Sequence, residues 1–75
     1  MIETAIRRIE IGRRIRETRK KKGITQAALA EAIGVRQGTL SAWERGGVDF
    51  RLNTLEAIAA ALGVKMAKLT SESRP

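Results

Sequence analysis

Apolar side chains recur along most of the chain at three- and four-residue steps, and glycines separate the segments that carry this pattern. Such steps place the apolar side chains on one face of an α-helix, whereas a half-buried strand alternates apolar and polar residues. A glycine after such a segment is typical of a helix end. The pattern therefore predicts an all-α protein whose five helices cover about residues 3–22, 26–33, 37–45, 52–62 and 65–69.

Two of these helices carry the apolar residues that we expect to fill the core. The first has isoleucines at steps compatible with one face, namely Ile2, Ile6, Ile9 and Ile15, with Ile11 beside them. The fourth has a continuous stripe that we expect to be buried, formed by Leu52, Leu55, Ile58, Ala59 and Leu62. Because the chain has 75 residues, these faces belong to one domain with a modest core.

Capping signals mark several of the helix ends. Thr25 precedes the second helix, and its hydroxyl is suited to accept a hydrogen bond from an amide of the first turn. Basic residues followed by Gly23 are typical of the end of the first helix. Asp49 and Arg51 are both candidates for the residue that begins the fourth helix.

The two ends of the chain are expected to lie outside the folded domain, which covers residues 11–70. Gly12 lowers the local helix propensity by up to about 1 kcal/mol. Residues 1–10 are therefore interpreted as an N-terminal extension, either a separate turn or continuous with the first helix. Residues 71–75 are interpreted as a flexible tail.

The chain contains neither cysteine nor histidine. Thiolate chemistry, the usual general base and the commonest zinc ligands are therefore missing, and we expect no enzyme activity, no metal and no cofactor. The longest apolar stretch, residues 57–63, is far shorter than the ~20 residues that a membrane span requires. No secretory signal is visible. These features predict a cytoplasmic protein.

Positive charge dominates the chain and is unevenly distributed. The net charge is +7 and the isoelectric point is about 11.2. Residues 1–22 hold nine of the basic residues and three of the acidic ones. This imbalance indicates a polyanionic partner, although charge alone does not separate DNA, RNA and anionic lipid.

The second and third helices meet the demands of a helix-turn-helix, in which two short helices cross steeply through a tight turn. Gly34 suits the positive φ of that turn, and Ala30 is small enough for the point where the helices cross. Apolar side chains occupy the inward positions, namely Leu29, Ile33, Val35, Leu40 and Trp43. The spacing predicts a helix-turn-helix over residues 26–45.

The combined pattern over roughly residues 11–70 resembles the Xre type of helix-turn-helix, the family of the phage lambda-like repressors and Cro proteins. The residues that carry the resemblance include Ile11-Gly12, Gly23, Thr25-Gln26, Leu29-Ala30, Gly34-Val35, Leu40-Ser41, Trp43-Glu44-Arg45-Gly46, Thr54-Leu55, Ile58-Ala59 and Ala61-Leu62-Gly63-Val64. The resemblance implies a compact five-helix, lambda-repressor-like DNA-binding domain. It also implies a homodimeric transcriptional regulator, with helix 37–45 in the major groove of double-stranded DNA and association with the nucleoid when bound. Repression is the expected mode.

The resemblance places the third helix against the bases. At 100° per residue, the side opposite Leu40 and Trp43 and the amino end of the helix supply the expected base contacts: Arg36, Gln37, Gly38, Ser41 and Ala42. Gln37 can make a bidentate contact with adenine, and Arg36 can do so with guanine or hold a phosphate. Arg36 departs from the family, which favours a hydroxyl residue here as the helix cap. The other three residues are small, so DNA shape is expected to contribute to recognition.

Contacts to the DNA backbone are expected from residues around the third helix, namely Gln26, Thr39, Arg45, Gly47, Arg51 and Lys22. Gln26 begins the second helix, whose free N–H groups and dipole favour an anion. The backbone amides of Gly46 and Gly47 lie in the loop that the family lays along the opposite strand.

Two charged residues are expected to have a structural role. In related domains the residues at the positions of Arg19 and Glu44 form a partly buried ion pair between the first and third helices. Trp43 is expected in the core rather than stacked on a base, because it lies one turn from Leu40 on the inward face.

Several alternatives accompany this interpretation. The chain could be an antitoxin that also regulates its own operon, with a toxin as protein partner, or the controller protein of a restriction–modification system. A basic amphipathic helix at the membrane surface over residues 1–22 is poorly supported, because the segment lacks an aromatic anchor. For the dimer, we favour a carboxyl-terminal patch of Val64, Met66, Leu69 and the exposed part of the fourth helix over the alternative, the extension with Ile2, Ile6 and Ile9.

Overall fold

The computed structural model describes residues 2–47 and 50–70, with the backbone alone for residues 2–6. The described part consists of helices α1 (Ile2–Lys21), α2 (Gln26–Ile33), α3 (Gln37–Glu44), α4 (Leu52–Leu62) and α5 (Met66–Thr70). The predicted all-α architecture of five helices is therefore confirmed. The tail predicted over residues 71–75 lies outside the described residues.

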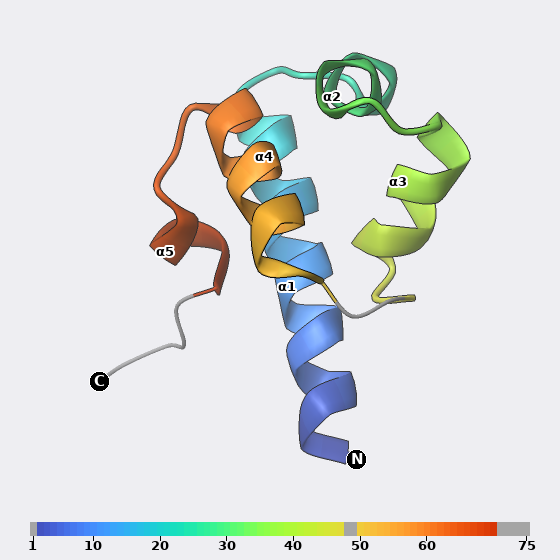
Figure 1. Ribbon diagram of the computed structural model, residues 1–75, viewed down its shortest axis with the longest axis vertical. Helices are drawn as coiled ribbons and strands as arrows, with labels where there is room; N and C mark the ends of the chain where they lie inside the picture. The colour runs from blue at the N-terminus through green and yellow to red at the C-terminus, as the bar shows by residue number, and fades with distance from the viewer. Residues whose placement is uncertain (1, 48–49, 71–75) are drawn as a thin grey trace.

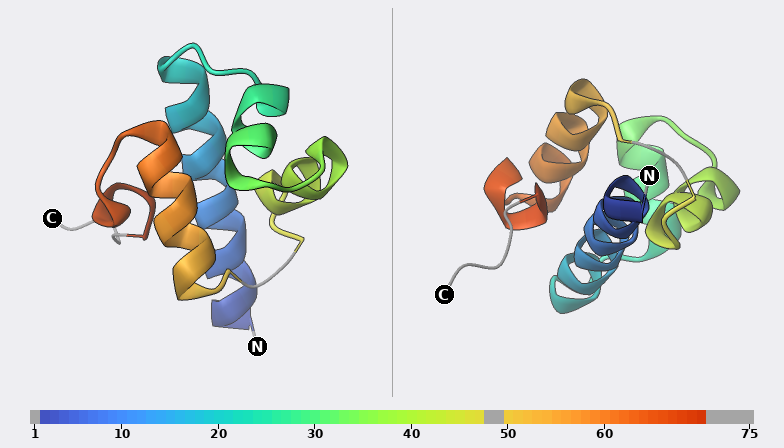
Figure 2. Two further views of the ribbon diagram at one scale, coloured as in Figure 1. Left: turned by 45° about the horizontal axis from the view of Figure 1, so that its top comes forward. Right: turned by 90° about the horizontal axis from the view of Figure 1, so that it is seen from below.

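Helix α1 is the axis around which the other helices are arranged. Figures 1 and 2 show α2 and α3 on one side of α1 and α5 on the other, with α4 running beside it. Because α1 is one uninterrupted helix from Ile2, the segment interpreted as an extension is continuous with the first helix over its described residues. None of the helices in the described part of the chain is both long and apolar enough to cross a membrane.

The helix ends follow the capping signals of the sequence. The Thr25 hydroxyl accepts a hydrogen bond from the Ala28 amide at 3.0 Å, and Gly34 ends α2 with a φ of 78°. These two features fix where α2 begins and ends. Helix α4 begins after Arg51, one of the two candidates, while Asp49 lies outside the described residues.

The core brings together apolar residues from all five helices: Ile11, Ile15, Leu29, Ala30, Leu40, Leu55, Ile58, Ala59, Leu62 and Leu69. Two expectations about it were wrong. Ile9 is 55% exposed, because six helical steps turn it about 120° away from buried Ile15. Leu52 is 64% exposed, because it lies at the first residue of α4, about 70° from the centre of the buried stripe.

The residues named for the carboxyl-terminal dimer patch are more buried than expected. Leu69 is fully buried and therefore belongs to the core. Val64 and Met66 pack partly against that core. These three side chains therefore leave little apolar surface for a second subunit, whereas Leu52 on α4 is exposed.

Helices α1 and α3 approach each other closely at Gly12. A Cβ atom on Gly12 would lie 2.5 Å from the carbonyl oxygen of Trp43 and 2.8 Å from that of Glu44. From the sequence, the only expected effect of this glycine was a lower local helix propensity. The structure shows that the residue is small because the backbone of α3 occupies the space a side chain would need.

Candidate nucleic-acid interface

Helices α2 and α3 form the tight, steeply crossing pair that the sequence predicted. Ala30 is 2% exposed, and its carbonyl accepts a hydrogen bond from the Val35 amide at 2.9 Å. Gly34 provides the left-handed conformation between the two helices. The turn therefore holds α3 in one orientation relative to α2.

Helix α3 has an inward side and an outward side. Leu40 is fully buried, and the partly buried Trp43 packs edge-on against Phe50, with ring centroids 5.9 Å apart. Both rings thus support the core. The residues predicted to face the bases lie outward: Arg36, Gln37 and Gly38 are exposed, and Ser41 and Ala42 are half-buried. Thr39, predicted on the DNA backbone, is exposed as well.

Arg19 and Glu44 form a buried ion pair that joins α1 to α3. Arg19 Nε donates to Glu44 Oε2 at 2.8 Å, and Nη2 donates to Oε1 at 3.0 Å. A third guanidinium nitrogen of Arg19 donates to the Ile24 carbonyl at 3.0 Å. The hydrogen bonds that Arg19 donates to Glu44 raise the pKa of the Arg19 guanidinium above its already high ordinary value. The arginine is therefore charged, and its charge is balanced where water is excluded.

Gln26 links this ion pair to the exposed end of α3. Its side-chain nitrogen donates to Glu44 Oε1 at 3.1 Å, and its oxygen accepts from the Gln37 amide at 3.3 Å. The side chain of Gln26 is thus held between Glu44 and Gln37. Gln26 was singled out from the sequence for its place at the start of α2. The bridge that its side chain forms between Glu44 and Gln37 was not predicted.

The two arginines that flank α3 differ in their contacts. Arg36 occupies the cap position and makes no side-chain capping hydrogen bond, because its guanidinium has donors only and cannot accept from a backbone amide. Arg45 donates to the Ser41 hydroxyl at 2.7 Å. That bond holds Arg45 along the outward side of the helix.

The loop after α3 corrects one expectation. The Gly46 amide donates to the Trp43 carbonyl and the Gly47 amide to the Ala42 carbonyl, both at 2.9 Å. These amides complete the end of α3 and are not directed outward as donors to a phosphate. Arg51, at the end of this loop, is exposed.

A basic groove of about 520 Å³ runs between α1 and α3. Its exposed cations are Arg16, Lys20 and Arg45, and the ion pair Arg19–Glu44 and Gln26 also line it. Arg16 is a functional candidate that was missed from the sequence. Helical phase was the signal that could have identified Arg16, because it lies three residues before Arg19 on the same side of α1.

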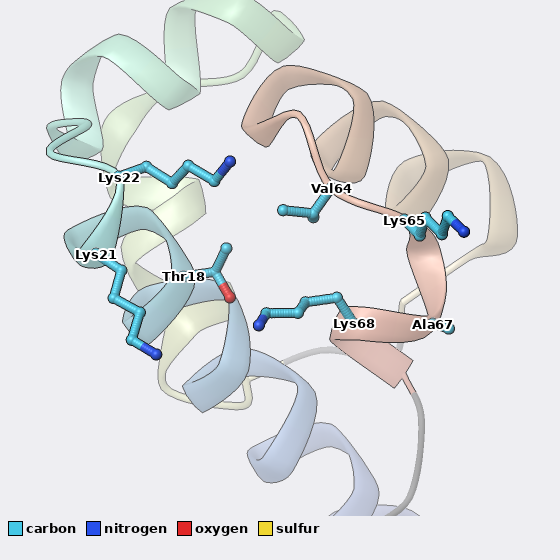
Figure 3. A pocket seen from close by; sticks show the side chains of 7 residues that line it. All are labelled: Thr18, Lys21, Lys22, Val64, Lys65, Ala67 and Lys68. Atoms are coloured by element: carbon cyan, nitrogen blue, oxygen red, sulfur yellow. The ribbon is translucent and has the colours of Figure 1, made fainter.

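Lys22, expected to contact the flanking DNA backbone, lies away from α3. It lines a second groove, of about 560 Å³, between the end of α1 and the α4–α5 region (Figure 3). In that view the Lys22 and Lys68 side chains reach toward the hollow beside Thr18 and Val64. Because α5 and α3 lie on opposite sides of α1, this groove faces away from the helix-turn-helix. Over the described residues, no group of three or more acidic side chains is placed to bind a metal ion.

Comparison with known proteins matches residues 15–69 to the helix-turn-helix family HTH_3. A relative among characterised proteins is the immunity repressor protein of Bacillus phage phi105, which is 37% identical over 62 residues. The match covers 83% of this chain and 43% of the repressor. The chain therefore spans less than half the length of that relative.

Two solved structures have the same fold over most of the chain. The clp gene regulator ClgR from C. glutamicum has a TM-score of 0.80 and 37% identity, with 83% of this chain and 80% of that chain covered. The restriction-modification controller protein C.AhdI from Aeromonas hydrophila has a TM-score of 0.77 and 31% identity. The match covers 81% of this chain and 92% of the controller protein.

Proposed function

The chain belongs to the helix-turn-helix family HTH_3, and from this premise we propose that it is a sequence-specific, double-stranded DNA-binding transcriptional regulator that acts as a repressor. The observation that carries the proposal is the presentation of α3. Its inward side is anchored by Leu40 and Glu44, while Arg36 and Gln37 are exposed at its amino end. That end is the part of a recognition helix that contacts base edges.

The proposed base contacts are Arg36, Gln37, Gly38, Ser41 and Ala42. Arg36 and Gln37 have the long polar side chains that read base edges, and the smaller residues allow close approach of the helix to the groove. The proposed contacts to the DNA backbone are Gln26, Thr39, Arg45 and Arg51, together with Arg16 and Lys20 of the basic groove. Cations on both sides of an inserted helix neutralise the phosphates that border the major groove.

Selection of binding sites from random duplex DNA tests this proposal. We expect an enriched sequence, and an affinity for it that falls steeply with salt because several phosphates are neutralised. The variants Arg36→Ala and Gln37→Ala are expected to lose preference at individual base pairs. Binding without any sequence preference would contradict the proposal.

A homodimer is the proposed binding unit. Ile9 and Leu52 are the candidates for the dimer contact, because they are the large apolar side chains exposed on the described surface. Sedimentation of Leu52→Glu and Ile9→Glu is expected to show which side chain lies in the dimer contact. An inverted repeat in the selected DNA would support the dimer independently.

The controller protein of a restriction–modification system is a second candidate. It is favoured by the likeness to C.AhdI, because nearly the whole of that controller is matched. Specific binding to the DNA upstream of this protein's own gene, with restriction and methyltransferase genes beside it, is the expected result.

An antitoxin role is supported by the lysine-lined groove on the far side of α1, since a partner could bind there while α3 is on DNA. Co-purification with the product of a neighbouring gene tests it.

A further inference from the structure

The lysine-lined groove between the end of α1 and the α4–α5 region carries positive charge on both of its walls. The end of α1 contributes Lys21 and Lys22, and the α5 region contributes Lys65 and Lys68. Over the described residues, none of these lysines forms an ion pair, and no acidic side chain lines this groove. Since a hollow lined by charges of one sign concentrates ions of the opposite sign, the groove is suited to an anion.

Two of the lysines reach into the hollow itself. Figure 3 shows Lys22 and Lys68 extending into it from opposite walls, whereas Lys65 points away. Lys22 Nζ lies 3.9 Å from the place that a Cβ atom on Gly63 would occupy, at the carboxyl end of α4. The carboxyl ends of α1 and α4 carry only about −0.5 charge each, which is less than the lysines supply, so the groove keeps a positive potential.

Thr18 adds a hydrogen-bond donor between these two lysines. The residue is 6% exposed, yet it lines the groove, and its hydroxyl oxygen lies on the side of Lys68 in Figure 3. Over the described residues, this hydroxyl has no hydrogen-bond partner. Buried polar groups are nearly always paired, so an unpaired hydroxyl at the floor of a basic groove indicates a ligand that accepts its hydrogen.

The groove also has an apolar part. Val64 and Ala67 line it beside the charged groups, and Val64 is half-buried. The methylene stems of the lysines add to this apolar surface. A phosphate, free or in a nucleic acid, would use only the charges. A peptide that carries a carboxylate next to an apolar side chain would use both parts, because burial of apolar surface adds to the free energy of binding.

We propose that the lysine-lined groove binds an acidic peptide segment of a partner protein. A carboxylate of the segment lies between Lys22 and Lys68 and accepts from the Thr18 hydroxyl, while a neighbouring apolar side chain packs on Val64. Because the groove lies on the far side of α1 from α3, this binding leaves the helix-turn-helix open to DNA. The inference goes beyond DNA binding. It names the partner chemistry for the antitoxin candidate, and it rests on the proposed function only for a joint complex with DNA.

Titration of the free protein with a synthetic peptide, followed by nuclear magnetic resonance, is the first test. In this peptide each leucine has a glutamate on both sides. We expect saturable shifts of the amide signals of Thr18, Lys22, Val64 and Lys68, while the signals of α3 are retained. A peptide with glutamine in place of glutamate should bind at least about tenfold more weakly, because it lacks the charged acceptor. A peptide with serine in place of leucine should bind about fivefold more weakly or worse, because it lacks the apolar contact.

Inorganic phosphate is the control ligand for a free anion. It should shift the same signals only at concentrations far above those of the glutamate–leucine peptide. Phosphate that binds as tightly as the peptide would overturn the proposal, and so would equal binding of the glutamine or the serine peptide.

Substitutions in the groove are the second test. Thr18→Val removes the hydroxyl and keeps the shape of the side chain, so the melting temperature should not fall, whereas affinity for the peptide should fall about tenfold. The double variant Lys22→Met with Lys68→Met should lose at least as much. Lys20→Met, in the basic groove beside α3, is the matched control and should retain the affinity for the peptide. Full affinity in either groove variant would contradict the proposed site.

Duplex DNA separates this inference from the proposed function. The peptide should still bind when the selected duplex is bound, and the variant Lys22→Met with Lys68→Met should keep its affinity for that duplex. If this variant lost affinity for DNA as strongly as for the peptide, the groove would be a nucleic-acid site and the proposal would be wrong. Failure of the proposed function gives a different result, namely no sequence preference for DNA while the peptide still binds at Thr18.

Discussion

Gly12 and Gly38 both lie inside helices, neither has a positive φ, and their surroundings are opposite. At Gly12 an added Cβ would press on the carbonyl oxygens of Trp43 and Glu44. At Gly38 an added Cβ would meet nothing within 4 Å. The protein itself therefore requires the first glycine to be small, whereas the second leaves space for a ligand that approaches α3.

Gly12→Ala is expected to destabilise the fold by about 1–3 kcal/mol, the usual cost of forcing an extra carbon into a packed contact. The carbonyl oxygens that it meets are backbone atoms of α3, so the two helices must separate. Thermal unfolding followed by circular dichroism measures the effect. A melting temperature equal to that of the unaltered protein would contradict the close contact.

Gly38→Ala is the matched substitution with the opposite expected effect on stability. Alanine at an open helical position is favoured over glycine by up to about 1 kcal/mol, so the melting temperature should rise. Affinity for the selected DNA should nevertheless fall, because the methyl group occupies the space through which α3 approaches the bases. If both stability and affinity rose, Gly38 would not be part of the DNA contact.

At the scale of the elements, α3 is held by contacts of its inward side and its carboxyl end rather than by a side-chain cap at its start. Its cap residue, Arg36, makes no capping bond, while Glu44 near the other end is paired with Arg19 on α1. The position of α3 therefore depends on the buried ion pair and on the contact at Gly12.

Glu44→Ala is expected to lower the free energy of unfolding by about 3–5 kcal/mol, because it leaves the Arg19 charge buried without its partner. Denaturant titration measures the loss. The control is the double variant Arg19→Met with Glu44→Leu, which removes both charges and should recover much of the stability. An unchanged midpoint in Glu44→Ala would show that the ion pair does not fix α3.

Arg36→Ser tests whether the arginine at the start of α3 contributes to DNA binding at the expense of helix stability. A serine there can accept a hydrogen bond from a free amide of the first turn and should stabilise the helix by about 1 kcal/mol. DNA affinity should fall about tenfold if the arginine contacts guanine or a phosphate. Stability and affinity that rise together would assign Arg36 no part in DNA binding.

At the scale of the whole molecule, two basic surfaces lie in grooves on opposite sides of α1. Arg16, Lys20 and Arg45 line the groove beside α3. A lysine set at the other groove comprises Lys21, Lys22, Lys65 and Lys68. A ligand that binds α3 therefore meets only the first surface directly.

Lys20→Gln and Lys68→Gln remove the same charge from the two surfaces. Lys20→Gln should weaken DNA binding and reduce the slope of log affinity against log salt by about one. Lys68→Gln should leave that slope nearly unchanged, since charges separated by more than the ~8–10 Å Debye length are largely screened. Equal effects of the two substitutions would contradict the assignment of the α1–α3 groove to DNA.

The sequence by itself determined the helices and the motif. Thr25, Gly34 and the apolar periodicity are local signals, and a cap or a positive φ depends on residues within one turn. This is why α2 and α4 begin and end where the pattern predicts. The exposure of Arg36 and Gln37 follows from their place at the amino end of α3 and not from helical phase, because residues three and four positions before buried Leu40 lie on the same side of the helix.

Only the tertiary structure decided which residues meet across helices. The close approach at Gly12, the bridge through Gln26 and the separation of Lys20 from Lys22 depend on interhelical distances and on the direction of each side chain. Periodicity does not contain that information, because it gives the phase of each helix but not its neighbour. The buried faces expected for Ile9 and Leu52 were wrong for a different reason, because helical phase turns both side chains away from the buried residues of their helices.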